Sequence, residues 1–123
     1  MFSRGWQLRV QDILQAISSI QQRTAGITFE EFSTDEMLFD SILYKFVVIG
    51  EAARNVPPDI QNRTPDIPWR LMSDMRNVIT HEYFQIKLRI VWDGIQMELP
   101  PLVEPLQRLL ASEAVKRGMS CSR

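Results

Sequence analysis

The sequence contains very few of the residues from which disulfides, metal cages and phosphate loops are built. Its 123 residues include one cysteine, one histidine and five glycines, which are isolated from one another. A single thiol, Cys121, cannot form an internal disulfide or complete a multi-cysteine metal site, and we expect it to be free in a reducing compartment. Without adjacent glycines there is no glycine-rich phosphate loop, and the histidine–glutamate metalloprotease motif and the Gly-x-Ser-x-Gly elbow are absent too. The single histidine, His81, is therefore the residue to explain.

Long hydrophobic runs are also missing. The longest apolar stretch, Phe46 to Ile49, is far shorter than the ~20 residues that a membrane-spanning helix requires. The N-terminus leads directly into an amphipathic pattern that contains charges, which is not the pattern of a signal peptide. We expect a cytoplasmic protein that has no membrane partner.

Neither sign of charge dominates. Fourteen basic residues against fifteen acidic ones give a formal net charge of −1, which excludes a histone-like protein that coats nucleic acid without specificity. Eleven of the fourteen basic residues are arginine, the residue best suited to bidentate phosphate contacts. Five of them are scattered through the middle of the chain: Arg54, Arg63, Arg70, Arg76 and Arg89. Such a scatter is more typical of a solvated surface than of a phosphate site, so composition alone does not indicate one.

Apolar residues recur at helical spacing along most of the chain, and no stretch alternates as a strand would. The predicted helices cover approximately residues 6–20, 35–55, 69–81, 85–99 and 102–116. Because the connections are short and favour antiparallel neighbours, the sequence predicts an all-α, up-and-down bundle of four or five helices. We expect one domain over residues 1–117 and a disordered tail over residues 118–123.

Several residues are suited to the helix ends. Gly26 can stop the first helix, and Pro68 can open the third at its first position. Two pairs fit the capping-box pattern, Thr28 with Glu31 and Ser33 with Glu36. We therefore interpret the acidic pairs Glu30/Glu31 and Asp35/Glu36 as helix caps.

The third predicted helix is amphipathic and holds the single histidine. On a wheel of 3.6 residues per turn, one arc is apolar and the opposite arc is polar. The apolar arc consists of Leu71, Met72, Met75, Val78 and Ile79, and the polar arc of Ser73, Arg76, Asn77, Thr80 and His81. A polar arc is commonly just a solvated face. Phe84, however, would continue this arc, so either the helix ends near His81 or a partner subunit covers that face.

Arg76 and His81 lie near the two edges of the polar arc, roughly 140° apart. Histidine titrates near cellular pH and can move protons, and arginine can hold a phosphodiester and the charge that develops on it. Metal-free RNA cleavage must deprotonate the ribose 2′-hydroxyl and protonate the leaving 5′-oxygen. A monomer with one histidine lacks a second proton carrier, whereas a symmetric dimer supplies two histidines and two arginines in one cleft. This chemistry favours a composite site in a homodimer.

The residues also match a known family pattern over about Leu8 to Leu110. The chain resembles the HepT-like toxins of the HEPN superfamily, which are encoded beside minimal nucleotidyltransferase (MntA-type) antitoxins. The matching segments, in order, are Ile49-Gly50-Glu51-Ala52-Ala53, Ile67-Pro68-Trp69-Arg70, Met75-Arg76-Asn77, His81-Glu82-Tyr83-Phe84, Val91-Trp92 and Leu99-Pro100-Pro101-Leu102. Arg-x4-His alone occurs often by chance, but the flanking segments make the pattern specific.

The resemblance implies a function and a role for each site residue. It implies the toxin of an HEPN/MNT toxin–antitoxin system, a dimeric, metal-independent endoribonuclease that needs no cofactor. Arg76 and His81 of each protomer would be catalytic, and Asn77 and Thr80 would orient the site or the RNA substrate. Tyr83 matches the tyrosine to which the nucleotidyltransferase antitoxin attaches AMP, a bulky anionic group that would block RNA.

Two alternatives stay open. The chain could be a non-catalytic helical dimer that serves as a nucleotide-binding or scaffold partner of a nucleotidyltransferase, in which case His81→Ala should leave its function intact. Tyr83 could be an amphipathic aromatic at a subunit interface and nothing more. Trp69 and Trp92 are expected to be core or interface anchors rather than base-stacking platforms.

Overall fold

The computed structural model describes residues 5–121, and it describes side chains for residues 5–112. This part of the chain forms helices and no strands, as predicted. The elements are α1 (Trp6–Thr24), α2 (Phe29–Thr34), α3 (Glu36–Arg54), α4 (Pro58–Arg63), α5 (Trp69–His81), the 3₁₀ turn η1 (Tyr83–Gln85), α6 (Leu88–Asp93), the π-helical turn η2 (Gly94–Glu98) and α7 (Pro100–Cys121).

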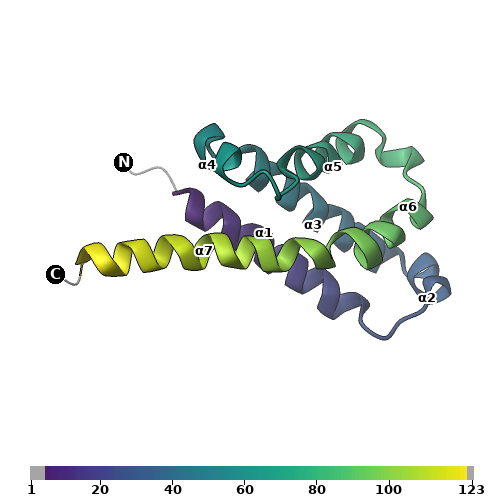
Figure 1. The fold of residues 1–123 in the computed structure, drawn as a ribbon. Coiled ribbons are helices and arrows are strands. Elements are labelled where there is room, and N and C mark those ends of the chain that lie inside the picture. The colour runs from purple at the N-terminus through teal and green to yellow at the C-terminus, as the bar shows by residue number, and fades with distance from the viewer. Residues whose placement is uncertain (1–4, 122–123) are drawn as a thin grey trace.

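Helix α3 is the centre of the bundle. It packs against α1 on one side and against α5 on the other, and α7 lies along α1 (Figure 1). Apolar residues on more than one face of α3 are buried, including Ile42, Phe46, Ile49 and Ala53. The packing of α3 on two sides explains why its sequence is more uniformly apolar than that of an ordinary surface helix.

The helix ends confirm most of the predicted caps. Gly26 follows α1 with a φ of 76°, a left-handed conformation that glycine adopts without strain. The capping box of α2 is present: the Glu31 amide donates to Thr28 Oγ1 at 3.1 Å, and the Thr28 amide donates to Glu31 Oε1 at 2.8 Å. These bonds satisfy amides that have no partner within the helix.

The second predicted capping box, Ser33 with Glu36, is wrong. Ser33 lies inside α2 and its hydroxyl donates to the Glu30 carbonyl at 2.9 Å, so it is not available to cap the next helix. Asp35 caps α3 instead, because its carboxylate accepts from the Leu38 amide at 3.0 Å. Asp35 is the residue directly before α3, so its carboxylate is closer than the Ser33 side chain to the unpaired amides of the first turn.

The two predicted C-terminal helices are arranged differently from the prediction. The fourth begins at Leu88 rather than near residue 85, because residues 83–85 form the 3₁₀ turn η1. The predicted helices over residues 85–99 and 102–116 leave out Pro100 and Pro101, but these prolines form the first turn of α7, where a missing amide hydrogen costs no helical bond. The turn η2 connects α6 to α7, and the Leu99 amide donates to the Gly94 carbonyl at 3.0 Å, a bond five residues long.

Helix α7 continues to Cys121, beyond the predicted end near Lys116. Residues 122 and 123 of the expected tail, and all side chains after residue 112, lie outside the described residues, so the domain boundary at 117 and the disordered tail stay predictions. Within residues 5–121, none of the helices has the length and hydropathy needed to cross a membrane.

The two tryptophans expected to be anchors both pack in the bundle, Trp69 within the buried core and Trp92 partly buried against it. Trp69 is buried, and its indole nitrogen donates to Thr64 Oγ1 at 2.9 Å. Trp92 packs against the rings of Phe29 and Phe32, with centroids 6.0 Å and 5.2 Å from its own. Both indoles therefore stabilise the bundle.

Candidate functional site

Helices α3 and α5 run antiparallel and approach each other closely at Gly50. A Cβ added at Gly50 would lie 2.8 Å from the Met72 carbonyl oxygen and would overlap the Cβ of Arg76. Any larger residue would force the helices apart. The absence of a side chain at Gly50 therefore sets the position of Arg76 against α3.

Arg76 is held by one residue from each of these helices. Its Nε lies 3.2 Å from Glu51 Oε1, and its NH1 group donates to Asn77 Oδ1 at 3.0 Å. The arginine side chain is 30% exposed, so its remaining N–H donors can still reach a ligand. A fixed, partly exposed guanidinium is suited to holding a phosphodiester.

Asn77 and Thr80 lie beside Arg76 on the exposed face of α5. Thr80 donates its hydroxyl hydrogen to the Asn77 carbonyl at 3.2 Å, a local bond to the preceding turn. The Asn77 side-chain oxygen is occupied by Arg76, which leaves the amide NH₂ group as a donor. Asn77 thus both orients the arginine and presents a polar donor beside it.

His81 is the last residue of α5 and is exposed. Its ring makes no hydrogen bond or ion pair with any residue that the structure describes. Arg76 is directed at α3, and His81 follows it by five residues, which turns the two side chains roughly 140° apart. Within one protomer, the side chains of Arg76 and His81 therefore point in different directions.

Tyr83 lies on the turn η1, immediately after α5, and contacts α3 through its hydroxyl. The hydroxyl donates to Asp40 Oδ1 at 3.3 Å, although the two residues are 43 positions apart. The negative charge of Asp40 raises the pKa of Tyr83 above the ordinary value of 10.0. Slight desolvation, the hydrogen bond itself and the charge of Glu36 add to the increase. The Tyr83 ring also stacks on Phe84, with centroids 5.3 Å apart.

A hollow of about 340 Å³ opens beside Tyr83, between α3 and the end of α5. Its lining is mixed, with a carboxylate and hydroxyl groups around an apolar floor: Asp40, Leu43, Tyr44, Val47, Ile79, Thr80 and Tyr83. The hollow leaves room for a small molecule next to the Tyr83 hydroxyl.

Two residues of this region were not predicted, Glu51 and Asp40. Glu51 lies within a segment that matches the family pattern, but the sequence does not show that it pairs with Arg76. Asp40 belongs to no sequence motif, and it lies beside Tyr83 only because of the antiparallel register of α3 and α5. Contacts across a helix pair depend on this register, which spacing along one helix does not determine.

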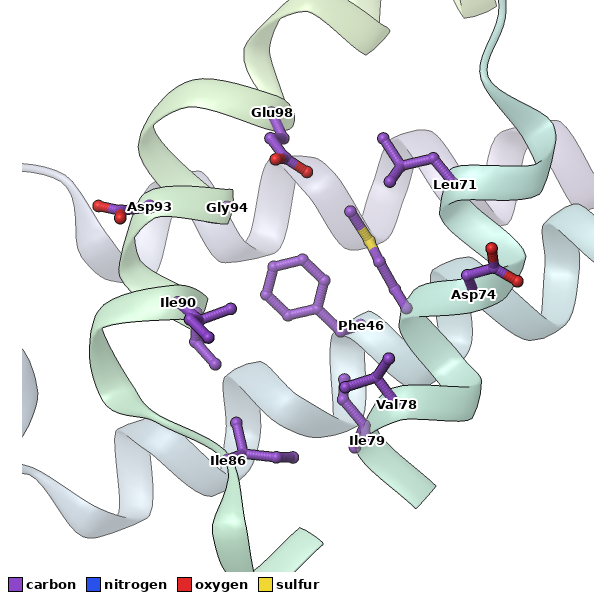
Figure 2. Close-up of a pocket in the computed structure, with 12 residues that line it drawn as sticks. Phe46, Leu71, Asp74, Val78, Ile79, Ile86, Ile90, Asp93, Gly94 and Glu98 are labelled. Atoms are coloured by element: carbon purple, nitrogen blue, oxygen red, sulfur yellow. The ribbon is translucent and has the colours of Figure 1, made fainter. Parts of the chain in front are cut away.

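A second, larger groove lies on the other side of α5, between that helix and the segment formed by α6 and η2 (Figure 2). Its volume is about 410 Å³, Phe46 lies at its centre, and most of its lining is aliphatic. Its charged residues are all acidic: Asp74, Asp93 and Glu98. Such a groove repels phosphate and suits an apolar protein surface better than RNA.

Among the side chains that the structure describes, no group of three or more histidine, cysteine or carboxylate residues is arranged to hold a metal ion.

Comparisons with known proteins agree on one family. The family model described as "Ribonuclease HepT-like" matches residues 13–109. A protein of Caldanaerobacter subterraneus subsp. tengcongensis, described as a "Putative RNase", is 33% identical over 85% of this chain and 93% of its own length. A "Probable ribonuclease HepT" of Thermococcus cleftensis is 34% identical over 81% of this chain and 91% of its own length. No solved structure matches.

Proposed function

The chain belongs to the HepT-like ribonuclease family, and from this membership we propose that it is a metal-independent endoribonuclease acting as the toxin of a bacterial toxin–antitoxin pair. Its substrate is RNA. The observation that supports the site most directly is the arrangement of Arg76, which Glu51 and Asn77 hold at the exposed edge of α5.

The residues fit the chemistry of phosphodiester cleavage. Arg76 would bind the scissile phosphate and stabilise the charge that develops on it, because its guanidinium is already fixed before RNA binds. His81 would transfer the proton between the reacting oxygens, since it is exposed and its ring is not engaged by the described residues. Asn77 and Thr80 would orient the RNA.

We propose that the complete site forms between two copies of the chain. The divergence of Arg76 and His81 within one protomer supports this, because a two-fold pair can bring the arginine of one copy to the histidine of the other. Apolar side chains exposed around the motif support it as well: Leu71 and Val78 on α5, Phe84 on η1, Ile90 on α6 and Met97 on η2. Phe84 is 98% exposed, an unfavourable state that a second copy would remove.

We propose that Tyr83 is the point of regulation, where a minimal nucleotidyltransferase antitoxin attaches AMP. The hydroxyl of Tyr83 is at the surface and borders the hollow between α3 and α5. An added phosphate there would place negative charge beside the RNA site and repel the substrate.

Cleavage of labelled RNA in excess EDTA tests the proposal. Wild type should cleave, and His81→Ala should lose at least about 100-fold in rate, the lower end of what a general acid or base contributes. Lys87→Ala, an exposed residue after the motif, is the matched control and should cleave as wild type does. The protein must be prepared without the antitoxin, and its mass must show no attached AMP.

Equal cleavage by wild type and His81→Ala would show a contaminating nuclease. If neither cleaves while both are folded dimers free of AMP, the chain is instead the non-catalytic partner of a nucleotidyltransferase.

A further inference from the structure

We propose that Asp40 is the proton acceptor that makes the Tyr83 hydroxyl a nucleophile. Asp40 is a positioning and activating residue for modification, separate from Arg76 and His81. The inference rests on the proposed function in so far as AMP is the group attached in the cell.

The geometry places the two groups in direct contact. The Tyr83 hydroxyl donates to Asp40 Oδ1 at 3.3 Å, so the proton that must leave already points at a carboxylate. The two residues come from different elements, α3 and η1, and the antiparallel packing of α3 on α5 brings these elements together. A contact between exposed residues 43 positions apart is not a by-product of helix periodicity.

The electrostatics explain why Tyr83 needs such an acceptor. An ordinary tyrosine is already neutral at cellular pH, and Asp40 and Glu36, both on α3, raise the pKa of Tyr83 further. A neutral phenol is a weak nucleophile unless its proton leaves as the new bond forms. The carboxylate that disfavours free phenolate is the same group that can accept the proton during attack.

The step balances with a nucleoside triphosphate as co-reactant, held by the nucleotidyltransferase. The Tyr83 oxygen attacks the α-phosphorus, and an oxygen–phosphorus bond forms. The bond between the α-phosphorus and its bridging oxygen to the β-phosphate breaks, and pyrophosphate leaves. The phenolic proton passes to Asp40, and the hollow of about 340 Å³ gives the reagent access to the hydroxyl.

The chain contains its own control for this inference. Tyr44 is the only other tyrosine, it borders the same hollow, and at 65% exposure it is more accessible than Tyr83 at 45%. Unlike Tyr83, Tyr44 makes no hydrogen bond to a carboxylate of the described residues. Both phenols border the hollow that Asp40 lines, but only that of Tyr83 is hydrogen-bonded to Asp40.

The test uses benzenesulfonyl fluoride, a small electrophile that needs no partner protein. An oxygen–sulfur bond forms on tyrosine, the sulfur–fluorine bond breaks, fluoride leaves, and the proton goes to the base. Labelling of Tyr83 and Tyr44 is measured separately by peptide mass spectrometry over a range of pH, in wild type, Asp40→Asn and Asp40→Glu. Asparagine can still accept the hydrogen bond but cannot take the proton.

In wild type we expect the labelling rate of Tyr83 to be nearly independent of pH, from above the range in which carboxylates titrate to below the range in which phenols titrate. In Asp40→Asn it should fall roughly 100-fold at neutral pH and rise about tenfold per pH unit, because only phenolate then reacts. Asp40→Glu should restore part of the constant region, and Tyr44 should react equally in all three proteins. Circular dichroism checks that all three are folded. Equal Tyr83 rates and pH profiles in wild type and Asp40→Asn would overturn the inference.

The labelling result does not depend on the toxin–antitoxin proposal. If the predicted labelling is found but protein from its own host carries no AMP on Tyr83 in the presence of its antitoxin, then the proposed regulation fails and the role of Asp40 stands. If AMP is found on Tyr83 but Asp40→Asn labels as wild type does, then the role of Asp40 fails and the regulation stands.

Discussion

At the scale of single residues, Glu51 is the contact that fixes Arg76. Glu51→Gln removes the charge but keeps the shape, so Arg76 should become mobile and RNA cleavage should fall about tenfold, with the loss in both kcat and KM. The free energy of unfolding should change by less than about 1 kcal/mol, because the pair is partly exposed to water. Steady-state cleavage and urea denaturation measure the two effects.

Glu104→Gln is the matched control for Glu51→Gln. Glu104 pairs with Arg108 at 3.2 Å, the same distance as the pair of Glu51 with Arg76, but on α7. Cleavage should be unchanged in Glu104→Gln. A similar loss of cleavage in both variants would show that the effect comes from net charge and not from the position of Arg76.

The ionisation of Tyr83 should reveal Asp40 directly. In Tyr44→Phe, Tyr83 is the only tyrosine, and ultraviolet titration should give a pKa above 10.0 that falls toward 10.0 when Asp40→Asn is added. Because the folded-state pKa is raised, the stabilisation by this hydrogen bond is fully present below 10.0 and is lost as pH rises through the raised value. An unchanged pKa in the double variant would contradict the contact.

The sequence alone supplies Arg76, Asn77, Thr80, His81 and Tyr83, because they share one short motif and one helix face. Their roles stay predictions. Glu51 and Asp40 could not be found in this way, since their importance arises from the register between two helices. The spacing of apolar and polar residues along a chain shows which face of a helix a residue occupies. It does not show which residue of another helix contacts it.

At the scale of elements, the approach of α5 to α3 depends on Gly50. Gly50→Ala should destabilise the fold by about 1–3 kcal/mol, because the new Cβ meets backbone and side-chain atoms of α5 that cannot move independently. Cleavage should fall as well, since Arg76 is displaced. Urea denaturation and the cleavage assay measure these effects.

Gly94→Ala is the control for Gly50→Ala. A Cβ at Gly94 would have its nearest neighbour, Phe46 Cζ, at 3.7 Å, an ordinary contact. The free energy of unfolding should be unchanged or up to about 1 kcal/mol higher, as alanine favours helix. Equal destabilisation by the two substitutions would mean that close approach at Gly50 is not the cause.

The predicted helix over residues 69–81 matches α5, but Pro68 lies at the N-cap position, directly before the helix, and not at its first position as predicted. The short helix α2 and the π-helical turn η2 were not predicted. Both are shorter than the window over which helical periodicity becomes visible. The wrong capping box at Ser33 has the same origin, since the pattern cannot show that Ser33 lies inside a helix.

At the scale of the whole molecule, the all-helical bundle follows from the sequence because helical periodicity and short connections leave few other arrangements. The dimer stays a prediction, and the exposed apolar side chains near the motif make it testable. Val78→Asp and Ile90→Asp should each shift sedimentation toward monomer, because each places a charge in the proposed interface. Leu8→Asp, an exposed position on α1, should sediment as wild type does.

Complementation between two inactive variants tests whether the site is shared by two protomers. Arg76→Ala and His81→Ala are purified separately, each is shown to be inactive, and the two are mixed under conditions in which subunits exchange. A mixed dimer contains one intact arginine and one intact histidine, on different protomers, so a shared site predicts that mixing restores a measurable part of wild-type cleavage. If mixed dimers form and wild type is active but the mixture stays inactive, one Arg76 and the His81 of the other protomer are not sufficient for cleavage, which contradicts the proposed pairing across the dimer.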